Sequence, residues 1–279
     1  MKKFILIFFN NKKSTVGFVI ILIFTLLAFI GPSVAPYDPQ GMNFIPLSSP
    51  SFSHPLGTNS YGQDLLSRIL VGTRLSLIVA ILTGLITTII STLIGLTSGY
   101  FGGVVDDILM TITNIFLVIP GLPLMIIIAA YITVKGVWPI ILVISFTGWA
   151  WGARVLRSQS LTLKNRDFVK AAVVTGESSF RIVLFEILPN MLSLIAANFF
   201  GTAVYAVLSE ATLEFLGLGS PEVISWGTIL YWAQNNQALM LGAWWWFVFP
   251  GLCIALLGTA FALMNFAVDE LTNPRLRKR

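Results

Sequence analysis

Charged residues are scarce in this sequence, and their scarcity excludes most classes of soluble protein. Only 10% of the 279 residues are charged, while 56% are hydrophobic; soluble proteins carry about 25% charged residues. A water-soluble domain could not cover its surface with so few charges, and a disordered chain would not be so apolar. The composition therefore indicates an integral membrane protein.

Cysteine and histidine are almost missing, which limits the chemistry available to the chain. The single Cys253 cannot form an internal disulfide, and the single His54 leaves little room for a histidine-based metal site. The sequence contains no His-Glu-x-x-His motif, no Gly-x-x-x-x-Gly-Lys-Ser/Thr phosphate loop, and no Ser/His/Asp set at one membrane depth. We therefore expect no enzyme activity, no catalytic or metal-binding residues, and no cofactor bound by this chain.

Long apolar runs occupy most of the sequence. A membrane-spanning helix needs about 20 mostly apolar residues. Six segments approach this requirement, at 16–34, 75–100, 108–132, 137–151, 191–208 and 244–268. The first run is too long for a signal-peptide core and has no obvious cleavage site, so we interpret it as a retained anchor. The pattern predicts an all-α integral membrane protein with about six transmembrane helices.

The basic residues are distributed unevenly along the chain. Six spans place both termini on one side of the membrane, and 14 of the 17 Lys and Arg residues lie at the two termini or between spans four and five. Basic loops face the cytoplasm, so both termini are predicted to be cytoplasmic. The formal charge of +5 thus reflects orientation, and we expect no nucleic-acid partner.

The longest cytoplasmic connection, about 152–190, has the features of a helical hairpin. Asp167 can cap a short helix over 168–175, and Gly176 can supply the left-handed residue that ends it. The expected starts of the next helices are Ser178 or Ser179, and Pro189. The hairpin would lie at the membrane surface, where its small alanines leave a low profile that another protein can approach.

This hairpin resembles the EAA loop of binding-protein-dependent ABC importer permeases. The family pattern is Glu-Ala-Ala, three residues, Gly, nine residues, and Ile-x-Leu-Pro. The matching positions are Ala171, Ala172, Gly176, Leu188 and Pro189, and the departures are Lys170 and Glu186. The resemblance implies that these seven residues form the loop that docks into a groove of an ATPase subunit and transmits its movement.

Further segments resemble the second permease of the dipeptide, oligopeptide and nickel branch of that family. They are residues 54–59, 62–68, 72–77, 209–219, 225–227 and 273–277. Gln63 and Glu214 replace the commoner Arg and Ser of the branch. Each motif is short, but together they follow the family order along nearly the whole chain.

The resemblance implies a type I ABC importer permease fold in a bacterial or archaeal cytoplasmic membrane. Residues 1–73 would form an anchor helix and external loop, and residues 74–279 a five-helix core with the coupling loop. The implied partners are a homologous second permease, two ATPases that bind ATP and Mg, an external solute-binding protein, and the lipid bilayer. The implied mechanism is alternating access for short peptides, with oligosaccharides or metal chelates as alternative solutes.

Four residues are candidates for the solute pathway or its external mouth: Glu210, Glu214, Pro120 and Trp226. The two glutamates are four residues apart and share a helix face, so they either line the mouth or are simply hydrated. Pro120 interrupts the third span, which is tolerated beside a water-filled cavity. Trp226 opens a tryptophan-rich outer segment.

Two other spacings suggest packing. Asp64 and Arg68 can pair on one helix face, and Gly95-x-x-x-Gly99 permits close helix approach and fits a contact between subunits.

Two other classes of protein fit the composition less well. An ion-coupled secondary carrier predicts inverted repeats and charges within the membrane, but no repeat is visible. An intramembrane enzyme would need a catalytic set. Either of these would work without ATPase partners, so co-purification with an ATPase discriminates between them and an ABC permease.

Overall fold

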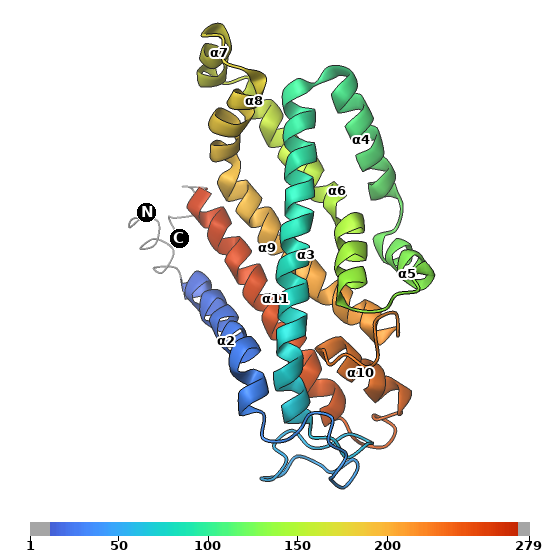
Figure 1. Ribbon diagram of the computed structural model, residues 1–279. Coiled ribbons are helices and arrows are strands. Elements are labelled where there is room, and N and C mark those ends of the chain that lie inside the picture. The colour runs from blue at the N-terminus through green and yellow to red at the C-terminus, as the bar shows by residue number, and fades with distance from the viewer. Residues whose placement is uncertain (1–11, 273–279) are drawn as a thin grey trace.

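The computed structural model of this protein describes residues 12–272, which form a bundle of helices (Figure 1). The helices are α2 (Lys12–Val34), α3 (Leu65–Phe101), α4 (Gly103–Val118), α5 (Gly121–Tyr131), α6 (Val137–Lys164), α7 (Asp167–Val174), α8 (Ser179–Arg181), a π-helix (Ile182–Ile187), α9 (Leu188–Phe215), α10 (Trp226–Asn235) and α11 (Trp245–Thr272). Helices satisfy every backbone hydrogen bond within one segment, as a bilayer requires.

Five helical segments are long and apolar enough to cross a membrane: α2, α3, α6, Ser179–Phe215 and Trp245–Phe266. The pair α4 and α5 makes a sixth if it counts as one span, but the two helices are bent by 90°. The break lies at Pro120, whose ring removes a backbone donor and cannot continue the preceding helix. The prediction of about six spans is confirmed, with the bent pair of α4 and α5 as the sixth.

The two ends of the described chain lie toward the same side of the bundle. Figure 1 shows that α2 begins and α11 ends on the side from which α7 and α8 project. The loop between α2 and α3 and helix α10 lie at the opposite end. This arrangement agrees with the predicted orientation; the basic residues near the two termini, apart from Lys12 and Lys13, lie outside the described residues.

Helix α3 starts at Leu65, ten residues before the predicted start of the second span. The Asp64 carboxylate caps this start by accepting bonds from the Ser67 N–H at 2.8 Å and the Ser67 hydroxyl at 2.7 Å. The predicted pair of Asp64 with Arg68 is wrong, because the Arg68 guanidinium donates to the Gln63 amide oxygen at 2.7 Å. The predicted division after residue 73 therefore falls inside α3.

Helices α3 and α6 pack closely against each other, because glycines remove side chains from their contact. A Cβ on Gly95 would lie 2.8 Å from the Ala153 carbonyl oxygen, and a Cβ on Gly99 would lie 2.6 Å from the Ser160 Cβ. Small residues allow such close approach of helices in membranes. Gly95-x-x-x-Gly99 therefore serves a contact within this chain, and the predicted contact between subunits is wrong.

A polar cluster fixes α4 against α3 and α6 at the end of the bundle near α7. The Asp106 carboxylate accepts two hydrogen bonds from the Arg157 guanidinium and one from the Ser98 hydroxyl. The Arg157 and Asp106 side chains are 30% and 14% exposed, so the ion pair is partly shielded from water. Bidentate pairs of this kind are the stronger charge-assisted bonds, and this one ties α4 to the bundle.

Replacing Asp106 with asparagine is expected to loosen α4. The amide keeps only part of the bidentate pairing, and a bond to a charged group contributes about 1.5–3 kcal/mol. Partial exposure reduces that figure, so we expect stability to fall by about 1 kcal/mol in thermal unfolding of the purified chain. Asp107→Asn removes the same charge from an exposed neighbour and serves as the control. An equal loss in both variants would contradict the anchoring role.

Candidate functional site: a cytoplasmic hairpin and a cavity on the flank of the bundle

The cytoplasmic hairpin, residues 165–187, reverses the chain between α6 and α9 at one end of the bundle (Figure 1). Helix α6 continues to Lys164, so the first part of the predicted connection 152–190 is helical. Helix α7 starts at Asp167, and Arg166 occupies the N-cap position without a side-chain bond. The prediction that Asp167 caps this helix is wrong; its carboxylate lies in the first turn, where it complements the helix dipole.

Gly176 ends α7 as predicted. Its φ is +81°, its N–H donates to the Val173 carbonyl at 3.1 Å, and the Glu177 N–H donates to the Ala172 carbonyl at 3.1 Å. This pair of bonds is a Schellman motif. Residues with a side chain rarely adopt such a φ, so Gly176 fixes the reversal at the tip of the hairpin.

The second arm of the hairpin leads directly into the fifth span. Ser178 caps it, since its hydroxyl oxygen accepts the Arg181 N–H at 3.4 Å, which confirms one of the two predicted caps. The π-helix Ile182–Ile187 follows, and Pro189 lies in the first turn of α9. The second short helix is therefore continuous with α9. Short π segments within α-helices occur frequently at functional sites.

The two faces of α7 differ in exposure. Val169 and Ala172 are 1% and 8% exposed and belong to a core cluster with α6 and the π-helix. Lys170 and Ala171 are exposed, and Val174 is 88% exposed. Of the two predicted alanines, only Ala171 thus lies on the outer face. That face carries the small Ala171 and the apolar Val174 together with the exposed Asp167 and Lys170, and another protein can contact it.

The remaining residues of the predicted coupling loop lie at the base of the hairpin. Glu186 is half-buried, and its carbonyl accepts a bond from the Asn190 side chain at 2.7 Å. Leu188 is half-buried against the same core cluster as Ala172, while Pro189 is exposed. These three residues join the hairpin to α9, so a movement of α7 has a direct covalent route into the fifth span.

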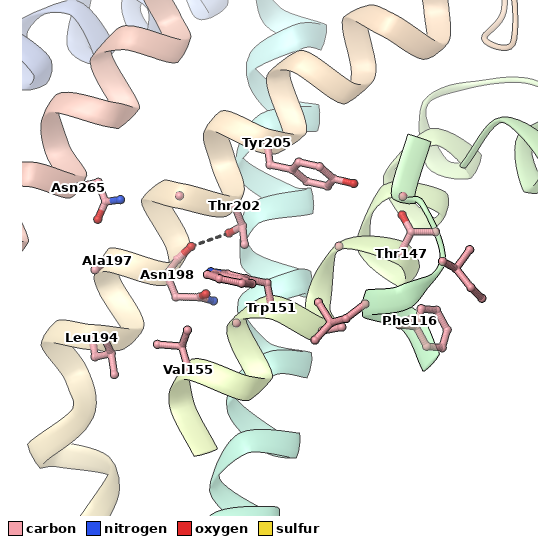
Figure 2. A pocket seen from close by; sticks show the side chains of 17 residues that line it. Phe116, Thr147, Trp151, Val155, Leu194, Ala197, Asn198, Thr202, Tyr205 and Asn265 are labelled. Carbon is pink, nitrogen blue, oxygen red and sulfur yellow. Dashed lines mark hydrogen bonds between the residues drawn. The ribbon is translucent and has the colours of Figure 1, made fainter. Parts of the chain in front are cut away.

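A cavity of about 570 Å³ lies where α6, α9 and the break between α4 and α5 meet. Figure 2 shows side chains from these helices and from α11 around it. Gly201 leaves space open, since a Cβ there would have its nearest neighbour at 3.7 Å, whereas Gly148 and Gly152 let Tyr205 and Asn198 pack closely at the edge of the cavity. Trp151 lines the cavity and is 68% exposed, so the cavity reaches the flank of the bundle.

The polar groups of the cavity are amides and hydroxyls. Asn198, Thr202 and Tyr205 come from α9, Thr147 from α6 and Asn265 from α11 (Figure 2). The Thr202 hydroxyl donates to the Asn198 carbonyl at 3.0 Å, and the Asn265 Oδ1 atom is buried without a protein donor among the described residues. The described lining contains no Lys, Arg, Asp or Glu.

Sequence reasoning did not identify these cavity residues. Asn198 and Asn265 each interrupt a long apolar run, and polar residues inside a span are usually functional. That signal could have selected both. It could not have shown that they share one cavity, because they lie on different helices that are far apart in the sequence.

The four predicted pathway residues occupy two different environments. Glu210, Glu214 and Trp226 are 0%, 3% and 0% exposed, so their side chains lie inside the described chain and neither line a mouth nor face water. Pro120 is exposed and lies between Ile119 and Gly121, which both line the cavity. Of the four, Pro120 is thus the one beside the cavity.

Comparison with known proteins extends these observations. The family described as "Binding-protein-dependent transport system inner membrane component" matches residues 91–278. The N-terminal transmembrane domain of oligopeptide transport permease C matches residues 1–51. Together the two matches cover most of the chain, including the cytoplasmic hairpin and the cavity residues.

Individual relatives match along nearly the whole length. The oligopeptide transport system permease protein OppC of Bacillus subtilis (strain 168) is 33% identical over 97% of this chain and 88% of its own. The dipeptide transport system permease protein DppC of Haemophilus influenzae is 33% identical over 100% of this chain and 96% of its own length. An inward-facing structure of the MetNI methionine ABC transporter has a TM-score of 0.52 at 19% identity, covering 71% of this chain and 94% of that chain.

The MetNI likeness shows a shared fold, and the near full-length relatives confirm the resemblance found in the sequence. The chain is a multi-pass inner-membrane permease that is not itself catalytic, and it works with ATPase and binding-protein partners. It belongs to the binding-protein-dependent transport system inner membrane component family, as a permease subunit of an ABC transporter.

Proposed function

We propose that this chain forms one half of a passage through which short peptides cross the membrane. The observation that carries the proposal is the flank cavity, lined by neutral amides and hydroxyls. Such groups pair with the donors and acceptors of a peptide backbone whatever side chains the peptide carries. The relatives from B. subtilis and H. influenzae are named as oligopeptide and dipeptide permeases, which supports this class of solute.

A homologous second permease would complete the passage. The cavity is open on its outer side, where Trp151 is 68% exposed and Ile119 is 40% exposed. In a bilayer, these apolar side chains suit a second membrane helix bundle. The seam between the two permeases would then enclose the solute, and alternating access would open it to each side in turn.

Two ATPase subunits would supply the energy from the cytoplasm. ATP and Mg bind to those subunits, and the cytoplasmic hairpin carries their closure into α9 through the π-helix. The exposed face around Lys170 and Ala171 supports docking there. A solute-binding protein would deliver peptides to the opposite end, near α10 and the loop between α2 and α3.

The alternative solutes have less support. The names of the relatives concern peptides, and they give no support to an oligosaccharide. The tryptophan-rich segment 225–246 could suit sugar stacking, but its first tryptophan, Trp226, is completely buried. A secondary carrier disagrees with membership in a binding-protein-dependent family.

Filling the cavity tests the proposal. A Cβ on Gly201 would have the Asn265 Nδ2 atom at 3.7 Å as its nearest neighbour, so Gly201→Leu extends into the cavity without displacing backbone. We expect uptake of labelled di- and tripeptides into proteoliposomes, with all partners present, to fall more than about tenfold, which corresponds to about 1.4 kcal/mol.

The matched control is Gly251→Leu on α11, where a Cβ meets nothing within 4 Å and which lies outside the cavity lining. This variant should transport at nearly the wild-type rate. Undiminished peptide uptake by Gly201→Leu would overturn the assignment of the cavity as the passage. Uptake of oligosaccharides but not of peptides by the wild-type assembly would overturn the class of solute.

A further inference from the structure

Two carboxyl groups are buried side by side in the last two turns of α9. The Glu210 and Glu214 side chains are four residues apart and are 0% and 3% exposed. The two side chains lie on one face of α9, where Ser76 of α3 contacts Glu210 and Ser225 at the start of α10 contacts Glu214. A buried carboxylate is very costly unless it is paired or loses its charge, and two adjacent buried carboxylates would also repel each other.

No cation compensates these carboxyl groups among the described residues. The groups that face them are the Ser76 hydroxyl from α3, which donates to the Glu210 Oε1 atom at 3.3 Å, and the Ser225 hydroxyl at the start of α10, which donates to Glu214. The other carboxyl oxygen of Glu210, Oε2, is buried without a protein N–H or O–H donor in the described chain. A proton carried by one of the two carboxyl groups would supply the hydrogen bond that this oxygen lacks.

The space around Glu214 is too small for a hydrated cation. A Cβ on Gly219 would lie 2.9 Å from the Glu214 Cγ, and a Cβ on Gly227 would lie 2.8 Å from the Glu214 Cβ. The backbone thus covers this side chain on two sides. In the part of the chain that the structure describes, no group of three or more His, Cys, Asp or Glu side chains could hold a metal ion.

We infer that Glu210 and Glu214 bind one proton between them, and that this proton keeps the pair buried where it bonds Ser76 of α3 and Ser225 at the start of α10. The protonated carboxyl group of one residue donates to the carboxylate of the other, so the pair carries a single negative charge. Ser76 donates to Glu210 and accepts the Trp226 N–H at 3.3 Å, so the same network holds the first turn of α10.

The proton therefore controls a contact at the end of the bundle opposite the cytoplasmic hairpin (Figure 1). Loss of the proton leaves two adjacent buried carboxylates on α9, and their mutual repulsion disturbs the bonds of Glu210 with Ser76 and of Glu214 with Ser225 that hold α10 in place. The inference concerns packing of α10 and does not rest on peptides being the solute, so failure of one leaves the other standing.

Infrared spectroscopy of the assembled transporter in a lipid bilayer detects the proton directly. The wild type is expected to show the C=O stretching band of one protonated carboxyl group at neutral pH, and both Glu210→Gln and Glu214→Gln are expected to lose it. Glu222→Gln changes an exposed carboxylate nearby and should leave the band unchanged. Absence of the band in the wild type, or its persistence in both buried variants, would overturn the inference.

Stability as a function of pH provides a readout independent of the spectrum. The wild-type assembly should lose thermal stability as the pH rises above the range in which an ordinary glutamate titrates, because the unfolded chain then ionises both carboxyl groups and folding must take up a proton. Glu210→Gln cannot lose this proton, and its amide N–H still donates to Glu214, so its stability should vary with pH less than that of the wild type. An unchanged loss with rising pH in Glu210→Gln would contradict the shared proton.

Two substitutions of different size at Glu214 distinguish the effect of the proton from the effect of side-chain packing. Glu214→Gln keeps the shape and is expected to transport within about twofold of wild type, a change of less than about 0.5 kcal/mol. Glu214→Ala removes the partner of Ser225 and leaves a void, and we expect more than a tenfold loss. Equal losses in the two variants would show that the charge, and not a proton-bearing pair, is required.

Discussion

Replacing Gly176 with proline is expected to abolish solute-stimulated ATP hydrolysis by the assembled transporter while the chain still inserts into the membrane. Gly176 has a φ of +81°, whereas proline is fixed near −65°. Proline also removes the N–H that donates to the Val173 carbonyl at 3.1 Å. Both changes open the Schellman turn at the tip of the hairpin, so α7 loses its orientation relative to α9.

The chain offers a matched control for this substitution. Gly242 has a φ of +78°, has no neighbour within 4 Å of a Cβ, and donates to the Leu239 carbonyl at 3.1 Å. It lies between α10 and α11, at the other end of the bundle. Gly242→Pro causes the same kind of local strain and should leave coupling largely intact.

Two further variants at the hairpin define the mechanism. Asparagine tolerates the left-handed region, so Gly176→Asn should retain most of the stimulated ATP hydrolysis. Ala171→Trp adds bulk to the exposed face of α7 and should uncouple transport without changing the turn. Wild-type stimulation by solute in Gly176→Pro would refute the coupling role of the hairpin.

Local signals in the sequence predicted the hairpin well. Gly176 and Ser178 act through bonds to residues within five positions of them, so nearby sequence contains the needed information. The same holds for the break at Pro120. Asp167 was misplaced by one position, because a carboxylate is favourable both as an N-cap and within the first turn of a helix.

Contacts between distant helices could not be predicted in the same way. The spans are apolar on all sides, so periodicity does not indicate which face packs against which neighbour. Gly95 and Gly99 suit a contact between subunits as well as a contact with α6. Likewise, the shared face of Glu210 and Glu214 was predictable, but their burial depends on α3 and α10 closing over them.

Replacing Gly99 with leucine is expected to prevent stable folding of the chain. A Cβ at this position would lie 2.6 Å from the Ser160 Cβ and 2.8 Å from the Arg157 carbonyl oxygen. Neither a backbone carbonyl nor a Cβ can move without shifting α6 itself. Overpacking costs about 1–3 kcal/mol where side chains can adjust, and we expect about 3 kcal/mol or more here because the backbone must yield.

The size of the expected loss of stability follows from the position of the strained contact between α3 and α6. Arg157 bonds Asp106 from the same turn of α6, so separation of α3 from α6 also weakens the anchor of α4. The measurement is the yield of folded chain after membrane extraction, together with its melting temperature. Gly258→Leu on α11, where a Cβ meets nothing within 4 Å, should fold normally. A well-folded Gly99→Leu variant would mean that α3 and α6 do not pack as closely as described, and that these glycines serve another contact.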